Sequence, residues 1–91
     1  MVVEVFGKDN CAVCQTTKRK LSHFLKKWGY SDRVDMVFVN MDTVDGMAEG
    51  AFRDVNDVPT TIVSDDGKTF GRWEGAVPPS DEVREVLSGC F

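Results

Sequence analysis

The feature that most constrains this chain is a pair of cysteines, Cys11 and Cys14, placed between an apolar run and a long helical pattern. The run VVEVF, residues 2–6, is rich in β-branched residues and predicts a buried strand. From about residue 11 to 28, apolar residues recur at helical spacing with Lys and Arg between them, which predicts an amphipathic helix. The chain must therefore fold so that two thiols lie where a strand passes into a helix.

The remaining elements can be read from their periodicity and from the residues that favour helix ends. We expect Asp9 or Asn10 to cap the first helix and Gly29 to end it. Ser80 is expected to cap a last helix, which Gly89 then ends. The elements between them are predicted as strands over 34–41, 60–63 and 68–75, a short helix over 43–56 and a hairpin turn at 64–68.

This order, β-α-β-α-β-β-α, predicts a single α/β domain over residues 1–91. A chain of this length has no room for a second hydrophobic core. Its two βαβ units predict parallel strand pairs, and the hairpin predicts an antiparallel strand at one edge. We therefore expect a four-stranded mixed sheet with helices on both faces, which is a three-layer fold.

Composition and charge exclude several classes of function. With 42% hydrophobic and 29% charged residues the chain is globular, and no apolar run approaches the roughly 18 residues that cross a bilayer. The net charge of -4 argues against nucleic acid as the main partner. The basic residues of the first helix suit either a solvated face or a docking surface for an acidic partner. Because the N-terminus lacks the pattern of a signal peptide, we expect a cytoplasmic protein that does not engage a membrane.

In that compartment a Cys-x-x-Cys pair favours metal or redox chemistry over a static disulfide. A thiolate at Cys11 would be stabilised by the unpaired amides and the dipole at the start of the helix. Lys8, three residues earlier, adds positive charge nearby, and Cys14 lies one helical turn further on, on the same face. A mixed disulfide on Cys11 could then be attacked by Cys14, which would release a reduced partner.

Other uses of the cysteines stay open at this stage. A structural disulfide across three residues would close a very short loop and stabilise the fold little. A zinc site would need His23, which lies roughly 13 Å along the helix from Cys14, and Cys90 from the far end of the chain. A metal held between two chains by Cys11 and Cys14 remains an alternative, whereas Cys90 is expected to be an incidental thiol.

The Cys-x-x-Cys at the start of this helix resembles that of the thioredoxin and glutaredoxin superfamily. The segment DVPTTIV, 57–63, and Gly75 before the last helix strengthen the resemblance, which covers nearly the whole chain. In that superfamily a cis proline faces the dithiol, and the residue before it pairs with an extended substrate strand. The resemblance thus implies a thioredoxin-like fold in which Val58, Pro59 and Thr60 bind the substrate, and Gly75 lets the partner's backbone approach.

The resemblance further implies a monomeric protein-disulfide reductase that needs no metal or organic cofactor. Lys8 precedes the first cysteine by three residues, as in glutaredoxins and in the redoxins that serve ribonucleotide reductase, and is expected to bind substrate. Ala12 and Val13 inside the pair match neither branch, and Val5 replaces thioredoxin's buried aspartate, with Glu4 expected to face solvent or an edge. The electron source is expected to be a flavin-dependent thioredoxin reductase, with glutathione as the alternative.

Two further functions remain open from the sequence. One is a glutaredoxin-type protein that depends on glutathione or holds an iron–sulfur cluster between two chains through Cys11. The other is a thioredoxin-like interaction module whose thiols no longer turn over. The first predicts a coloured dimer, and the second predicts that replacing Cys11 leaves partner binding intact.

Overall fold

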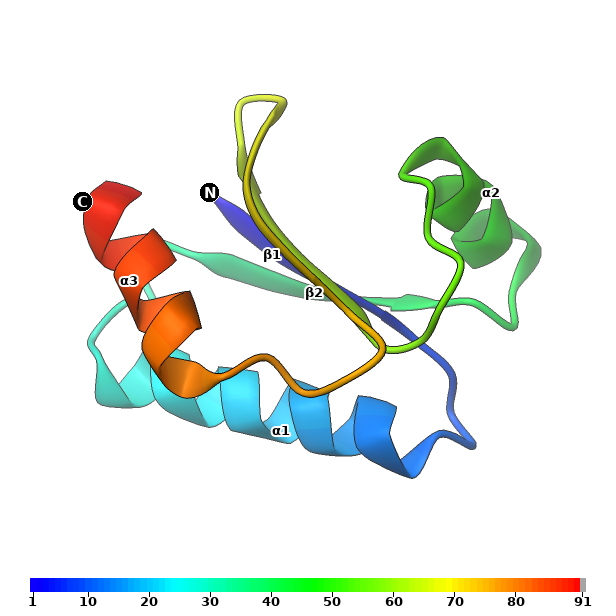
Figure 1. Ribbon diagram of the computed structural model, residues 1–91, viewed down its shortest axis with the longest axis horizontal. Coiled ribbons are helices and arrows are strands. Elements are labelled where there is room, and N and C mark those ends of the chain that lie inside the picture. The colour runs from blue at the N-terminus through cyan, green and yellow to red at the C-terminus, as the bar shows by residue number, and fades with distance from the viewer. Residues whose placement is uncertain (91) are drawn as a thin grey trace.

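The sheet at the centre of the molecule has four strands in the order β2-β1-β3-β4 (Figure 1). This computed structural model describes residues 1–90. The elements follow one another as β-α-β-α-β-β-α, which confirms the expected order. Their bounds are β1 (Val2–Gly7), α1 (Ala12–Lys27), β2 (Asp35–Asn40), α2 (Val44–Phe52), β3 (Thr60–Asp65), β4 (Lys68–Glu74) and α3 (Ser80–Cys90).

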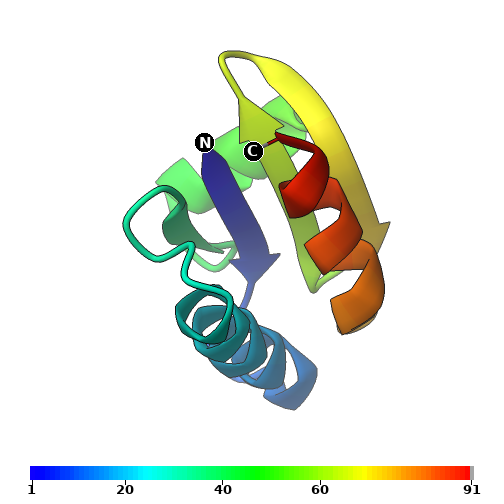
Figure 2. The same ribbon diagram turned by 90° about the vertical axis from the view of Figure 1, so that its left-hand side faces the viewer.

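Helices cover both faces of the sheet, as predicted, so that the fold has three layers. Helices α1 and α3 lie on one face and α2 lies on the other (Figure 2). Side chains along β1 point alternately to the two faces of the sheet. Val3 and Val5 pack with Leu21 and Leu87 on the face covered by α1 and α3. Phe6 packs with Val55 and Ile62 on the face covered by α2. No helix within residues 1–90 has the length and apolar character needed to span a membrane.

Only one of the two expected parallel strand pairs forms. β1 runs parallel to β2, with Val5 opposite Phe38, but antiparallel to β3, with Val5 opposite Thr61. The prediction that the second βαβ unit is parallel was therefore wrong. Helix α2 has nine residues and is about 13 Å long, whereas a six-residue strand spans about 20 Å. Helix α2 and the loop after it leave the chain at the end of the sheet where β2 stops, so β3 starts there and runs back along β1.

The start of α1 also differs from the prediction. Cys11 itself occupies the cap position, because its carbonyl accepts the first helical hydrogen bond, from the Gln15 amide at 3.1 Å. Asp9 and Asn10 lie in the turn before it and do not cap the helix. At the other end Gly29 follows the helix with φ 77°, in the left-handed region that favours glycine, as expected.

The last helix begins and ends elsewhere than expected. Ser80 is the first residue of α3 and not its cap, since the Val83 amide donates to the Pro79 carbonyl at 3.1 Å. Proline has no backbone N–H to donate, but its carbonyl can accept the first hydrogen bond of a helix. Pro79 therefore suits the position just before α3. Gly89 does not take a positive φ, and the helix continues through it to Cys90.

Candidate active site

Cys11 and Cys14 are joined as a disulfide at the start of α1, with 5.1 Å between their Cα atoms. Cys11 caps the helix through its sulfur, which accepts a hydrogen bond from the Cys14 amide at 3.1 Å. The turn before it is closed by the Lys8 carbonyl, which accepts from the Cys11 amide at 3.2 Å and from Gln15 Nε2 at 3.3 Å. The Cys11 sulfur is therefore held among the unpaired amides of a helix N-terminus.

The two sulfurs differ in their access to solvent. Cys11 is partly exposed, whereas Cys14 is completely buried. Cys14 packs on Gly7, the last residue of β1, where an added Cβ would lie 2.8 Å from the Cys14 Cβ and 3.0 Å from its sulfur. The sequence prediction missed Gly7, although a glycine between a buried strand and a Cys-x-x-Cys helix signals a close approach. The pair thus has one accessible and one protected sulfur.

The loop before β3 forms the neighbouring wall. The Val58–Pro59 peptide bond is cis, and Pro59 and Thr60 are buried while Val58 is half-buried. Since Thr60 lies opposite Phe6 in the antiparallel pairing, Pro59 comes beside the Gly7 position on which Cys14 packs. The structure therefore brings this segment and the dithiol to the same end of the sheet.

Gly75 lies next to this segment, at the end of β4. Its φ is 79°, a left-handed conformation in which a residue with a side chain would be strained. Its amide donates a hydrogen bond to the Pro59 carbonyl at 2.8 Å. A Cβ on Gly75 would meet no atom within 4 Å, so the surface above it is open.

Lys8 lies in the turn before the dithiol, but its ammonium group is directed to an acidic partner. Its Nζ is 4.0 Å from the Asp42 carboxylate, and both side chains are half exposed. The same turn is tied to the end of β2 because Asn40 donates to the Asp9 carboxylate at 3.1 Å. The contribution of Lys8 that the structure shows is the carbonyl that closes the turn at Cys11.

Glu4 is not the edge or solvent-facing residue that the sequence predicts. Its side chain is 12% exposed, and its Oε1 lies 2.8 Å from Nη1 of Arg53, the residue after α2. The expectation failed because β1 lies between β2 and β3 and has no free edge. Glu4 faces α2, whereas the Cys14 side chain lies between α1 and the opposite face of the sheet, so Glu4 is not placed to take a proton from Cys14.

On the face that carries Cys14, the position next to Val5 holds a polar group. Thr61 of β3 lies directly opposite Val5 and is fully buried. Its hydroxyl is buried without a hydrogen-bond partner in the described part of the chain. Sequence reasoning missed this residue, because nothing in a strand of Thr, Ile and Val indicates that the hydroxyl is unpaired.

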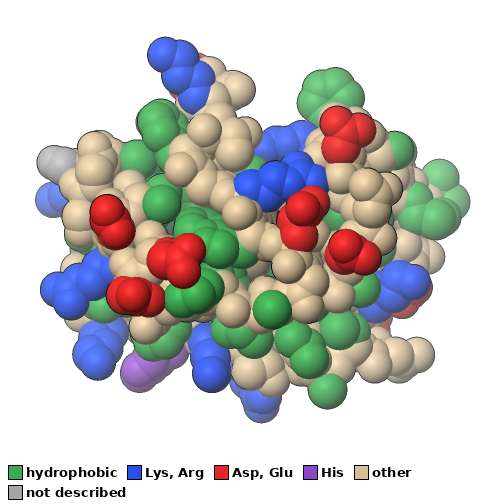
Figure 3. All heavy atoms as spheres, viewed as in Figure 1, with side chains coloured by type: hydrophobic (Ala, Val, Ile, Leu, Met, Phe, Trp, Pro, Cys, Tyr) green, Lys and Arg blue, Asp and Glu red, His purple; other side chains and the backbone are tan. Residues whose placement is uncertain are grey.

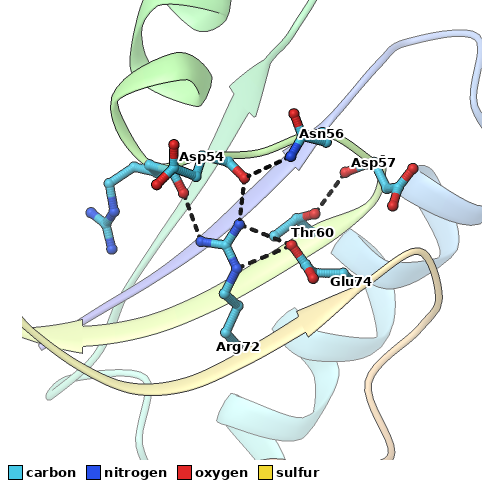
Figure 4. A network of polar contacts seen from close by, with 7 residues as sticks. Asp54, Asn56, Asp57, Thr60, Arg72 and Glu74 are labelled. Carbon is cyan, nitrogen blue, oxygen red and sulfur yellow. Dashed lines mark hydrogen bonds and ion pairs between the residues drawn. The ribbon is translucent and has the colours of Figure 1, made fainter.

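A network of polar contacts fixes the loop that leads to the cis proline (Figure 4). Arg72 of β4 donates to the carbonyls of Arg53 at 2.7 Å and of Asp54 at 2.8 Å, and to the Glu74 carboxylate at 2.9 Å. The Thr60 hydroxyl donates to the Asp57 carbonyl at 2.6 Å. Both ends of the loop over residues 53–57 are therefore anchored to the sheet.

The two other residues considered as metal ligands, His23 and Cys90, lie apart from the dithiol. His23 is exposed on α1 beside Phe24, with 5.9 Å between ring centres, and Cys90 lines a groove between β4 and α3. Within residues 1–90 no three His, Cys, Asp or Glu side chains are grouped so that they could hold a metal ion. The basic residues of α1 are exposed, and Lys18 lies 4.9 Å from the centre of the Phe38 ring; their role in docking stays a prediction.

Comparison with known proteins places this chain in a family. The model of the thioredoxin-like domain matches residues 1–89, so the chain belongs to the thioredoxin-like domain family. No curated protein sequence gives a significant match. The family and the Cys11–Cys14 pair at disulfide distance together support thiol–disulfide oxidoreductase chemistry.

Solved structures with the same fold include thioredoxins from distant organisms. Thioredoxin 1 from Thermosipho africanus is 22% identical, with a TM-score of 0.78 over 99% of this chain and 93% of that chain. Fasciola hepatica thioredoxin is 24% identical, with a TM-score of 0.74 over 97% and 78% of the two chains. Thioredoxin O2 from Arabidopsis thaliana in its oxidised state is 17% identical, with a TM-score of 0.77 over 99% and 74%. At these identities the likeness shows the fold alone.

Proposed function

We propose that this protein is a protein-disulfide reductase that works through its dithiol. In the reduced protein the Cys11 thiolate attacks one sulfur of a substrate disulfide, so that a mixed disulfide forms and one substrate thiolate leaves. Cys14 then loses its proton and attacks the Cys11 sulfur, which closes the Cys11–Cys14 disulfide and releases the second substrate thiolate. Two electrons pass from the dithiol to the substrate, whose two thiolates take up two protons.

The observation that carries this proposal is the asymmetry of the pair. The Cys11 sulfur is accessible and accepts the Cys14 amide at 3.1 Å, as a thiolate at a helix N-terminus would. The Cys14 sulfur is buried against Gly7, where a bulky substrate disulfide has no access. Cys11 therefore suits the attacking role and Cys14 suits the resolving role.

Four residues beside the dithiol suit the binding of an extended substrate segment. Val58 is half-buried and Gly75 presents open space, while Pro59 and Thr60 are buried beneath them. The hydrogen bond from the Gly75 amide to the Pro59 carbonyl holds the two segments together. We propose that the backbone of Val58 pairs with the substrate and that Gly75 allows the substrate to approach.

The electron source and the cellular setting belong to the same proposal. We propose a monomer that acts in the cytoplasm and is reduced by a flavin-dependent reductase of the thioredoxin type. Glutathione is the competing donor, because the Ala12–Val13 dipeptide between the cysteines is typical of neither branch. A glutathione adduct on Cys11 would assign the protein to the glutaredoxin branch.

A redox titration tests the proposal directly. The purified protein is equilibrated in glutathione buffers, trapped by alkylation and analysed by mass spectrometry. A reversible Cys11–Cys14 disulfide with a potential of about -270 mV is expected for a thioredoxin-type reductant, whereas a value near about -200 mV indicates the glutaredoxin type. If the pair never closes reversibly, the proposed reductase activity is wrong and the interaction module becomes the better description.

A further inference from the structure

Helix α2 presents its apolar side chains to solvent instead of to the sheet. Five residues lie on one side of it at spacings of i, i+3, i+4, i+7 and i+8, which we name the α2 outer stripe: Val44, Met47, Ala48, Ala51 and Phe52. Val44 is 78% exposed, Met47 50% and Phe52 81%. Figure 3 shows hydrophobic side chains standing out over α2, at the right of the view. In most surface helices a stripe of this spacing faces the core.

The opposite side of α2, which lies against the sheet, is formed by two buried glycines. A Cβ on Gly46 would overlap the Asn40 carbonyl oxygen, and a Cβ on Gly50 would overlap the Met41 side chain. The backbone of α2 therefore packs directly on the end of β2. Because no other side of the helix could approach so closely, these glycines fix its rotation and direct the α2 outer stripe to solvent.

Acidic side chains border this stripe. Asp45 and Glu49, one turn apart, lie along one side of it, and Asp54 and Asp57 follow the helix. None of the four carboxylates forms an ion pair with another residue in the range 1–90. Arg53, the one basic residue of the segment 44–57, is paired with Glu4 at 2.8 Å. One side of the stripe thus carries two carboxylates, Asp45 and Glu49, that no basic side chain of the described residues pairs with.

We propose that the α2 outer stripe is a docking site for a partner protein that presents apolar side chains flanked by Lys and Arg, as a basic amphipathic helix does. Exposed apolar patches with a polar border mark interaction sites, and helices dock through anchors at this spacing. The acidic border selects a basic partner by charge complementarity. A second copy docked stripe to stripe would bring like charges together, and an anionic membrane would repel this surface.

The position of the stripe relates it to the dithiol without depending on the chemistry proposed there. Helix α2 lies at the end of the sheet where α1 starts (Figure 1). The loop after α2 leads directly into Val58 and Pro59, and the Lys8–Asp42 ion pair connects the turns before the two helices. A partner bound to α2 would therefore lie at the same end of the sheet as the candidate active site.

A nuclear magnetic resonance titration of the ¹⁵N-labelled full chain tests the docking site. The probe is a synthetic helical peptide of Leu and Lys, about 14 residues long, with leucines at i, i+3, i+4, i+7 and i+8. We expect saturable shifts centred on residues 44–52. A peptide in which Glu replaces Lys should bind at least about tenfold more weakly. No binding, equal binding of the two peptides, or shifts centred elsewhere would overturn the proposal.

Variants of exposed residues separate the stripe from other apolar surface. Phe52→Gln should weaken binding of the Leu/Lys peptide about tenfold, as loss of an aromatic anchor does. Phe70→Gln is the matched control, because Phe70 is 46% exposed on β4, and it should leave the affinity unchanged. Equal affinity of the Phe52→Gln and unaltered proteins contradicts the docking site.

Sedimentation velocity measures whether the protein associates with itself. Self-association that Phe52→Gln abolishes would overturn the proposal and make a second copy of the chain the occupant of the stripe. These readouts do not require redox turnover, so they fail or succeed independently of the reductase activity.

Discussion

Arg72 and Arg53 are joined across the surface of the sheet: Nη1 of Arg72 donates to the Arg53 carbonyl at 2.7 Å. The side chain of Arg53 in turn contacts Glu4 on the central strand at 2.8 Å. Between them these contacts hold the segment that turns from α2 towards Pro59, including Asp54 with its left-handed φ of 56°. Aspartate is among the non-glycine residues that adopt this conformation most readily, and the contacts on either side hold Asp54 in it.

Replacing Arg72 should therefore loosen this segment. Arg72→Met leaves two carbonyls and the Glu74 carboxylate without their donor, and should lower the free energy of unfolding by about 1–2 kcal/mol in urea titrations. Amide hydrogen exchange over residues 53–57 should rise. The control is Lys68→Met on the same strand, which should change neither quantity. An Arg72→Met protein as stable and as protected as the control would show that the network does not hold the loop.

The two cysteine variants should fail in different ways. Cys11→Ser removes the attacking sulfur and should abolish reduction of a protein disulfide such as that of insulin. Cys14→Ser keeps the attack but removes the resolving sulfur, and should accumulate mixed disulfides on Cys11 that mass spectrometry detects. Equal residual turnover in the two variants would contradict the assigned roles.

Gly7→Ala should destabilise the protein, because the added methyl group would press against Cys14. The added Cβ would lie 2.8 Å from that of Cys14, so α1 must shift or the core must distort. Overpacking of this kind costs roughly 1–3 kcal/mol of unfolding free energy. Gly89→Ala is the opposite case, because nothing lies within 4 Å of its Cβ and it sits in α3. It should stabilise the protein by less than the roughly 0.5–1 kcal/mol of a mid-helix position, because Gly89 is the second-to-last residue of α3. The two changes are compared by chemical unfolding, and a Gly7→Ala protein of unaltered stability would refute the close contact.

Two neighbouring threonines provide a matched test of buried hydroxyls. Thr61→Val removes a buried hydroxyl without a partner and should raise the free energy of unfolding by about 1 kcal/mol. Thr60→Val removes a hydroxyl that donates to the Asp57 carbonyl at 2.6 Å, and should lower it by about 1 kcal/mol. Both changes keep the side-chain shape, and urea titration measures both. Effects of the same sign would mean that the hydroxyls do not differ as described.

Local patterns were enough to predict the order of elements and the position of the dithiol. Apolar periodicity distinguishes strands from helices, and Cys11 and Cys14 lie at an element boundary that the change of period makes visible. The thioredoxin-like fold followed from these two features together with the segment around Pro59. The direction of β3 did not follow, because it depends on where α2 and its loop leave the chain in space.

The details that escaped prediction are contacts between distant residues. Glu4 pairs with Arg53, which lies 49 positions further along the chain, so no local pattern could show that its carboxylate is partly buried and ion-paired. Gly7 was overlooked although its place between a buried strand and the Cys-x-x-Cys helix is a local signal, because the distance between α1 and β1 shows only in the structure. The sequence predicted Asp9 or Asn10 as the cap of α1, whereas the structure has Cys11 there, because its sulfur can accept the hydrogen bond of the Cys14 amide.

Helix α2 packs on the sheet through Gly46 and Gly50, so one side of the helix makes the contact with the interior and the other side is free to bind a partner. The contact with β2 is made by backbone and glycine, so the outward side chains make no contribution to the interior on that side. Substitutions at Val44, Met47 or Phe52 can therefore alter which partner the surface recognises while the fold keeps its stability. In evolutionary terms α2 is a place where specificity can diverge among proteins that retain the same dithiol.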